Sequence, residues 1–71
     1  MAIIKEIKIN DDFITLGQFI KVLDLISSGG EAKRFLLENT IKINNQEEKR
    51  RGKKLYKNDL IEINDILYKI C

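Results

Sequence analysis

Alternating apolar and polar positions predict strands at both ends of the chain. Residues 3–9 read Ile-Ile-Lys-Glu-Ile-Lys-Ile, so β-branched side chains of one parity can face a core. We expect an edge strand there, followed by a turn at residues 10–12. Residues 60–63 and 66–70 are apolar runs separated by Asn64-Asp65. Two turn-forming residues between such runs predict a tight hairpin.

A first helix is predicted to follow Thr15. The Thr15 hydroxyl can accept from the backbone N–H of Gln18, whose side chain can reach back, which is a capping box. Ile14 before the cap can pack on Phe19 as a hydrophobic staple. The helix is expected to end near Ile26 or Ser27, and helical spacing gives it one apolar stripe of Leu16, Phe19, Ile20, Leu23 and Ile26.

A second helix is predicted between Ser28 and about Glu38. Ser28 and Glu31 have the spacing of another capping box. Asn39 is well placed as the left-handed residue that closes the helix. The buried edge is expected to consist of Ala32, Phe35 and Leu36.

The third part of the chain is predicted to be a short strand and a long polar loop. Residues 41–43 alternate as Ile-Lys-Ile, and Asn44-Asn45 is a turn signal. Residues 46–57 are polar and basic around Gly52, so we expect a loop in which Leu55 and Tyr56 are the large apolar groups.

Composition limits the chemistry open to this chain. With 71 residues it is one small domain, expected over residues 1–71, and 44% hydrophobic with 34% charged residues suits a folded protein. The sequence has no His and one Cys, Cys71, which removes His-based catalysis, ordinary zinc sites and an internal disulfide. We therefore expect no enzyme, no cofactor and no metal. No apolar run could cross a bilayer and no signal-peptide core appears, so a cytoplasmic protein without membrane contact is expected.

Charge is strongly segregated although the net charge is only +2. Residues 33–57 carry a net charge of +6, and the rest of the chain carries −4. Such a chain has one cationic face, and its natural partner is a polyanion. Most of the excess lies in the basic run, residues 49–57, which reads Lys-Arg-Arg-Gly-Lys-Lys-Leu-Tyr-Lys.

The basic run is more typical of nucleic-acid contact than of a solvated surface, because its charges are unbalanced. Lys33 and Arg34 can contact phosphate or, alternatively, Arg34 can pair with Glu38 one turn later. Tyr56 can stack on a base or anchor the loop.

Two weaker sites have structural alternatives. The Ser28-Gly29-Gly30 segment can cradle a phosphate on its backbone amides, but a turn between helices is the more frequent explanation. Asp11-Asp12 can hold a metal, but turn residues with favourable charge ahead of a helix are the better interpretation.

The order of these features resembles the S4-like RNA-binding domain, also called the αL motif, and most closely its short stand-alone bacterial members. The resemblance covers about residues 14–63. Ser28 starts the second helix, a small residue follows four positions later, and Lys33 comes next, as in the family. The pattern apolar-any-apolar-Asn then appears at residues 41–44, and Asn58-Asp59-Leu60 matches a later Gly-Asp before a strand. The chain departs at Gly29, where many members have Arg.

The resemblance implies an α+β fold with two helices packed on a short, bent antiparallel sheet and a long basic loop. It implies a monomer that recognises structured RNA, ribosomal or tRNA-like, with the ribosome or its assembly intermediates as a further partner. An assembly adaptor or a DNA binder with the same fold remains the alternative. The residues expected to contact RNA are Ser28, Gly29, Lys33, Arg34, Lys42, Lys49, Arg50, Arg51, Lys53, Lys54, Tyr56 and Lys57.

Overall fold

A computed structural model describes residues 4–71, and the strand expected over 3–9 is observed as β1 (Ile4–Ile7). Ile3 lies outside the described residues. β1 is an edge strand of a five-stranded sheet, as expected, and Ile7 packs against the core. The other strands of this sheet, in spatial order from β1, are β7 (Ile66–Ile70), β6 (Leu60–Ile63), β3 (Ile41–Ile43) and β4 (Gln46–Glu47).

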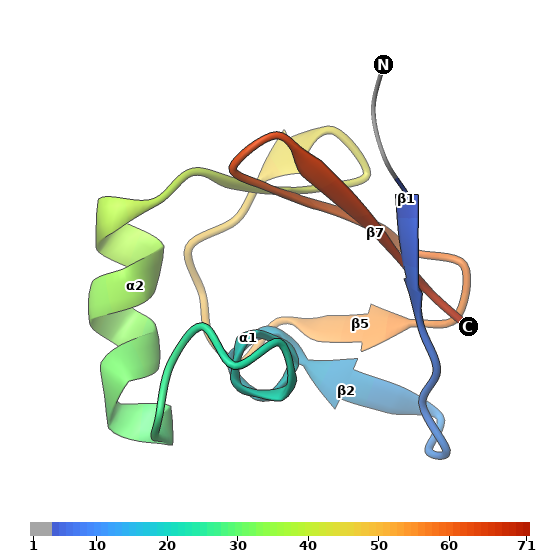
Figure 1. Ribbon diagram of the computed structural model, residues 1–71, viewed down its shortest axis with the longest axis horizontal. Coiled ribbons are helices and arrows are strands. Elements are labelled where there is room, and N and C mark those ends of the chain that lie inside the picture. The colour runs from blue at the N-terminus through green and yellow to red at the C-terminus, as the bar shows by residue number, and fades with distance from the viewer. Residues whose placement is uncertain (1–3) are drawn as a thin grey trace.

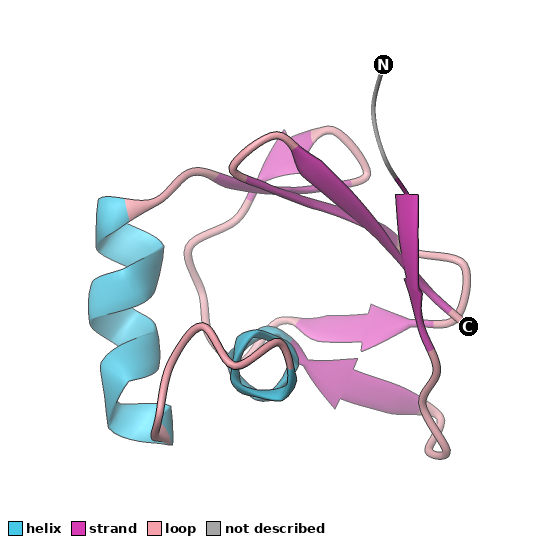
Figure 2. Ribbon diagram, in the orientation of Figure 1, coloured by secondary structure: helices cyan, strands magenta, loops and turns pink. Residues whose placement is uncertain are grey.

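The sheet is mixed, so the expectation of an antiparallel sheet is wrong for β1. β1 pairs with β7 in parallel, whereas β7–β6, β6–β3 and β3–β4 are antiparallel pairs. A parallel pair needs a long crossover connection. Here almost the whole domain, including both helices, lies between the two strands and returns the chain in the same direction (Figures 1 and 2).

Both predicted two-residue turns are confirmed. Asn44 and Asn45 have φ of 51° and 71° between β3 and β4, and Asn64 and Asp65 have φ of 49° and 68° between β6 and β7. Two consecutive residues with positive φ match the twist of a hairpin, and Asn and Asp tolerate this conformation better than most residues.

The segment expected to be a loop over residues 46–57 contains two strands instead. Besides β4, it holds β5 (Lys54–Tyr56), which pairs antiparallel with β2 (Phe13–Thr15). The sequence does not reveal this two-stranded ribbon, because three-residue strands show too little alternation and their partners are far apart in the chain. The ribbon lies below the main sheet in Figure 1.

The capping box at the start of α1 (Leu16–Val22) is confirmed. The backbone N of Thr15 donates to Oε1 of Gln18 at 3.1 Å, and the backbone N of Gln18 donates to Oγ1 of Thr15 at 3.3 Å. The predicted stripe also faces inward, since Leu16, Phe19, Ile20 and Ile26 are buried and Leu23 packs against them.

α1 ends four residues earlier than expected, at Val22. Asp24 takes the left-handed conformation with φ of 63°. Its backbone N donates to the carbonyl of Lys21 at 3.0 Å, and the N of Leu25 donates to the carbonyl of Ile20 at 3.1 Å. These two bonds form a Schellman motif in which Asp stands where Gly is usual.

Replacing Asp24 with glycine should therefore stabilise the protein. Removing Cβ at a left-handed residue relieves more than the added flexibility of the unfolded chain costs, for a net gain of about 0.5–1 kcal/mol. Urea unfolding of Asp24→Gly measures this gain. The control is Asp12→Gly, because Asp12 has no positive φ and should only lose stability. Equal effects of the two changes would contradict the assignment.

The second predicted capping box is wrong. Ser28 precedes a 3-10 turn, η1 (Gly29–Glu31), and makes no side-chain cap bond. The Glu31 carboxylate instead accepts from the backbone N of Ser27 at 3.4 Å. Two consecutive glycines are poor helix formers, so the α-helix begins only at α2 (Ala32–Glu38).

The left-handed conformation expected for Asn39 is also wrong. Asn39 is extended, with φ of −126° and ψ of 149°. It closes α2 with its side chain, whose Nδ2 donates to the carbonyl of Phe35 at 3.0 Å. As predicted, Ala32 and Leu36 are buried and Phe35 is half-buried.

One core joins both helices, the sheet and the ribbon. In Figure 1, α1 is seen end-on between α2 on one side and the β2–β5 ribbon on the other. The ring of Phe19 on α1 meets that of Tyr68 on β7 edge to face, with centroids 5.6 Å apart. The buried side chains are Leu16, Phe19, Ile20, Ile26, Ala32, Leu36, Ile41, Ile43, Leu55, Ile61, Ile63, Tyr68 and Ile70.

Candidate nucleic-acid interface

The first half of the basic run is held on the N-terminus of α1. The backbone N of Leu16 donates to the carbonyl of Lys53, and that of Gly17 to the carbonyl of Arg51, both at 2.8 Å. The first amides of a helix have no partner within the helix, so they are available to the loop. The backbone of the basic run is therefore fixed while its cationic side chains remain exposed.

Gly17 permits this close approach. A Cβ at Gly17 would lie 3.3 Å from the carbonyl oxygen of Arg51 and 3.7 Å from Cβ of Ala32. Gly17 on α1 thus lies against both the basic run and the start of α2. Nη1 of Arg51 also lies 3.5 Å from the carbonyl of Gly29 in η1, so the structure brings together the basic run and the Gly29–Lys33 region that the sequence selected.

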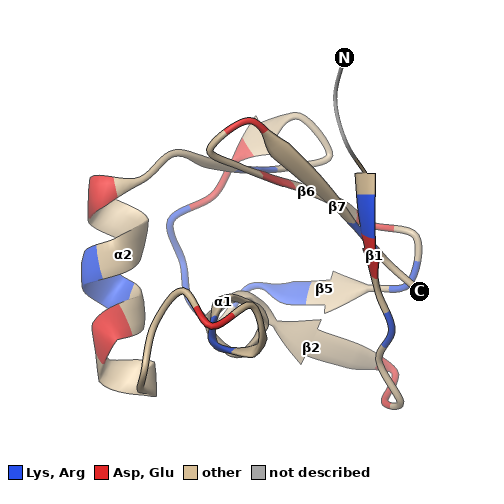
Figure 3. Ribbon diagram, in the orientation of Figure 1, with Lys and Arg blue, Asp and Glu red and all other residues tan. Residues whose placement is uncertain are grey.

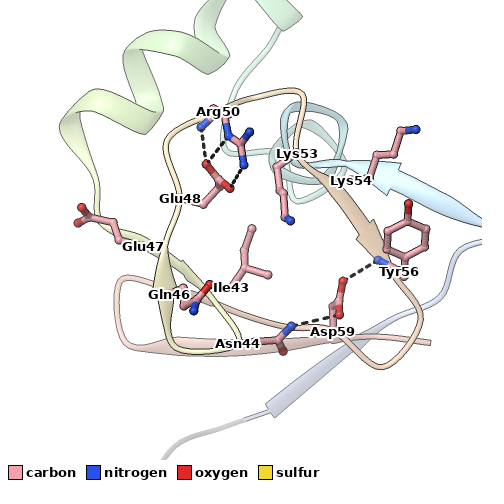
Figure 4. Close-up of a pocket in the computed structure, with 10 residues that line it drawn as sticks. All are labelled: Ile43, Asn44, Gln46, Glu47, Glu48, Arg50, Lys53, Lys54, Tyr56 and Asp59. Carbon is pink, nitrogen blue, oxygen red and sulfur yellow. Dashed lines mark hydrogen bonds and ion pairs between the residues drawn. The ribbon is translucent and has the colours of Figure 1, made fainter.

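A hollow of about 330 Å³ lies beside the basic run (Figure 4). Figure 4 shows the side chain of Lys53 directed into the hollow and Arg50 above it. Tyr56 lies on the edge opposite Glu47. Four predicted contact residues therefore line one concave surface. The complete lining consists of Ile43, Asn44, Gln46, Glu47, Glu48, Arg50, Lys53, Lys54, Tyr56 and Asp59.

Glu48 holds Arg50 in place. Its carboxylate accepts from Nε and Nη2 of Arg50, both at 3.0 Å, and from the backbone N of Lys49 and of Arg50 at 3.1 and 3.2 Å. The bonds from the Arg50 side chain are the main reason that the pKa of Glu48 falls to about 2. Glu48 thus orients Arg50 and offsets part of its charge.

Glu48→Gln should lower stability above pH 4.5 and lose that effect near pH 2. The folded pKa of Glu48 lies below its ordinary value of 4.5, so the contribution of the ionised carboxylate is complete above 4.5 and is lost as the pH falls toward 2. Thermal unfolding of both proteins across this range should give curves that converge at low pH. At neutral pH we expect a loss of about 1 kcal/mol. A constant difference at all pH values would contradict the role of this carboxylate.

Asn44 and Asp59 position Tyr56. The sequence did not indicate this role for either residue. Oδ2 of Asp59 accepts from the backbone N of Tyr56 at 2.8 Å, and Oδ1 of Asp59 accepts from Nδ2 of Asn44 at 3.2 Å. Oδ1 of Asn44 accepts in turn from the backbone N of Leu60 at 3.0 Å. These bonds give a structural reason for the Asn44 and Asn58-Asp59 pattern.

The remaining predicted residues lie outside the hollow. Arg34 forms the ion pair with Glu38 that the sequence allowed, on the exposed face of α2. Lys42 on β3 lies opposite Glu47 and Glu62 on the neighbouring strands. Four others are exposed without lining the hollow: Ser28, Lys33, Lys49 and Lys57.

Cations remain in excess over residues 33–57 after the ion pairs are taken into account. Within residues 4–71 the ion pairs are Arg34–Glu38 and Arg50–Glu48. Figure 3 shows the blue stretch between β4 and β5 passing beside α1, with further blue on α2. The cations of residues 33–57 outside those pairs are Lys33, Lys42, Lys49, Arg51, Lys53, Lys54 and Lys57.

The weaker alternatives gain no support from the geometry. Among residues 4–71, no three His, Cys, Asp or Glu side chains gather where they could hold a metal ion, Asp11 and Asp12 included. Across the same range, no helix combines the length and the apolar character needed to cross a membrane. A hydrogen bond to Glu6 raises the pKa of the Cys71 thiol, which disfavours the nucleophilic thiolate.

Comparison with known proteins identifies the family. The model of the S4 domain matches residues 7–71, which extends the match beyond the residues 14–63 that carried the resemblance. The chain is also 51% identical, over 57 residues and 80% of each protein, to the probable ribosome maturation protein RlbA of Bacillus subtilis (strain 168). The chain therefore belongs to the S4 domain family.

Proposed function

We propose that this protein binds structured RNA and acts in ribosome maturation without catalysing a reaction. Family membership and the printed name of the Bacillus relative support the RNA and ribosomal parts of the proposal. The observation that carries it is the fixed backbone of the basic run on α1, which presents Arg51 and Lys53 from a rigid support. A rigid array of cations suits phosphates at set spacings, as in a folded RNA.

The interface extends from the hollow to the start of α2. Arg50, Lys53 and Lys54 line the hollow, and Arg51 connects it to η1. Lys33 follows η1 directly on α2. In this proposal a phosphate backbone passes over the basic run, with Lys33 at one end of its path. Lys42 and Arg34 contribute less, because acids lie beside them.

The side chains that could act as a nucleophile, a general acid or a general base are unsuited to catalysis, which is why no reaction is proposed. The sequence has no His, and the Cys71 thiol has a raised pKa. The one strongly shifted carboxylate, Glu48, is held ionised by Arg50 and is therefore a poor general acid or base at neutral pH. We further infer a cytoplasmic monomer whose partner is ribosomal RNA or an assembly intermediate that contains it.

Affinity for RNA should fall steeply with salt. If about five to seven cations meet phosphates, log K against log salt has a slope of about −4 to −6. Fluorescence anisotropy with a labelled fragment of ribosomal RNA, from low to about 0.2 M salt, measures this slope. A flat dependence would contradict the proposal and favour an assembly adaptor.

Competition distinguishes the classes of polyanion. Labelled RNA is displaced with unlabelled RNA of the same sequence, with duplex DNA of matched length and with polyglutamate. We expect only the RNA to compete efficiently at about 0.2 M salt, because non-specific phosphate binding fades over this range. Equal competition by DNA would point to a DNA binder, and no binding of any polyanion would point to a protein partner.

A further inference from the structure

The solvent face of the β2–β5 ribbon carries two aromatic side chains side by side. Phe13 and Tyr56 are direct cross-strand partners, 37% and 49% exposed. Their ring centroids lie 6.0 Å apart and the rings are tilted by 51°. We call these two side chains the aromatic platform. Large aromatic groups usually bury most of their surface, so an exposed pair on a three-residue ribbon needs an explanation.

The two side chains of the aromatic platform are not part of the hydrophobic core. Successive side chains of a strand point to opposite faces. Leu55, the neighbour of Tyr56, is completely buried, and Ile14, the neighbour of Phe13, packs against the core. The ribbon is therefore anchored by its inner face. Leu55, rather than Tyr56, therefore anchors the end of the basic run in the core.

Cations lie beside the aromatic platform on the side of the basic run. Nζ of Lys54 lies 4.8 Å from the centroid of the Phe13 ring. Tyr56 lines the hollow together with Lys53 and Arg50. A second concavity of about 390 Å³ is lined by Arg50, Gly52, Lys53, Lys54 and Tyr56. Aromatic faces next to phosphate-binding side chains are the chemistry that receives an unstacked nucleobase and its backbone.

We propose that the aromatic platform stacks on an unpaired nucleobase of the bound RNA while Lys53 and Lys54 contact its flanking phosphates. This inference rests on the proposed function. It specifies the RNA ligand as a helical RNA with an unpaired nucleotide, such as a bulge. The backbone bond from Tyr56 to Asp59, and the contact of Asp59 with Asn44, hold the tyrosine in place for this contact. The alternative is that the pair only stabilises the ribbon as cross-strand neighbours do.

The test compares two RNA duplexes that differ only by one bulged nucleotide. Stacking on one base corresponds to roughly tenfold tighter binding of the bulged duplex by the wild type. Tyr56→Val and Phe13→Val introduce a β-branched side chain that suits a strand but remove the rings, and each should abolish this preference. Tyr56→Phe, the matched control, should keep it. Arg51→Ala should weaken both duplexes by similar factors and leave the preference intact.

A spectroscopic readout separates stacking from a general loss of affinity. With 2-aminopurine at the bulge, saturating wild-type protein or Tyr56→Phe should change the emission of the base as it stacks. Saturating Tyr56→Val should not. Thermal unfolding verifies that each variant is folded, and Phe13→Val provides the same test should Tyr56→Val not fold.

The outcomes distinguish this inference from the proposed function. An unchanged bulge preference in both valine variants would show that the pair only stabilises the ribbon. Equal weakening of both duplexes by Tyr56→Val would also overturn base stacking while leaving RNA binding intact. If the wild type binds neither duplex, the proposed function fails, and this inference fails with it.

Discussion

Leu55→Ala should remove most of the stability of the protein. Leu55 is completely buried in β5, between exposed Lys54 and Tyr56. Truncating a buried leucine to alanine costs about 2–5 kcal/mol through lost burial and the cavity left behind. A domain of 71 residues without a disulfide has only about 3–5 kcal/mol in total. Urea unfolding and far-ultraviolet circular dichroism measure the loss.

Neighbouring positions provide the controls for this prediction. Tyr56→Val changes an exposed residue of the same strand and should cost less than about 1 kcal/mol. Leu55→Val is a smaller truncation and should lower the free energy of unfolding by about 1 kcal/mol. This variant remains folded enough to measure if Leu55→Ala is unfolded. Should Leu55→Ala melt at the wild-type temperature, β5 would not be anchored in the core and the basic run would not be fixed there.

The second large effect concerns RNA affinity. Arg51→Ala combined with Lys53→Ala should weaken RNA binding by about 30-fold, or about 2 kcal/mol, because two charge-assisted contacts to phosphate are lost. The side chains of both residues are exposed, and their carbonyls, which accept the bonds from α1, remain in the variant. The melting temperature should therefore stay close to that of the wild type. Anisotropy titrations at constant salt measure the change.

A charge-matched variant separates position from net charge. Lys5→Ala with Lys8→Ala removes two exposed lysines, one in β1 and one just after it, outside residues 33–57. This variant should weaken binding by less than about threefold, since distant exposed charges are screened by salt. If both double variants weaken binding equally, net charge alone governs affinity and the interface assigned to the basic run is wrong.

Local signals in the sequence were sufficient for several elements. The Thr15–Gln18 capping box, the inward stripe of α1 and both two-residue hairpin turns all depend on residues close in sequence. The segregation of charge was equally clear from the sequence, because it requires only a count of charged residues along the chain. The S4 family was recognised from the order of these local features, and the match over residues 7–71 confirms it.

Some local signals were misleading because competing contacts won. Ser28 and Glu31 have capping-box spacing, but the Glu31 carboxylate bonds to Ser27 and the two glycines form a 3-10 turn. Asn39 suits a left-handed helix end, yet its side chain caps α2 from an extended backbone. In both cases the spacing of the residues alone does not show which hydrogen bond the side chain makes.

By itself, the sequence determined the helical stripe, both two-residue turns, the β6–β7 hairpin, the family and the excess of positive charge over residues 33–57, since each follows from residues near one another in the chain. Only the tertiary structure decided the parallel β1–β7 pair, the β2–β5 ribbon and the exposed aromatic platform of Phe13 and Tyr56. The tertiary structure also showed that the basic run, expected to be a loop, is held on α1 by backbone hydrogen bonds and supports the cationic side chains there. The physical reason is that these features depend on backbone groups left unpaired elsewhere, such as the first amides of α1, and on which distant segment reaches them.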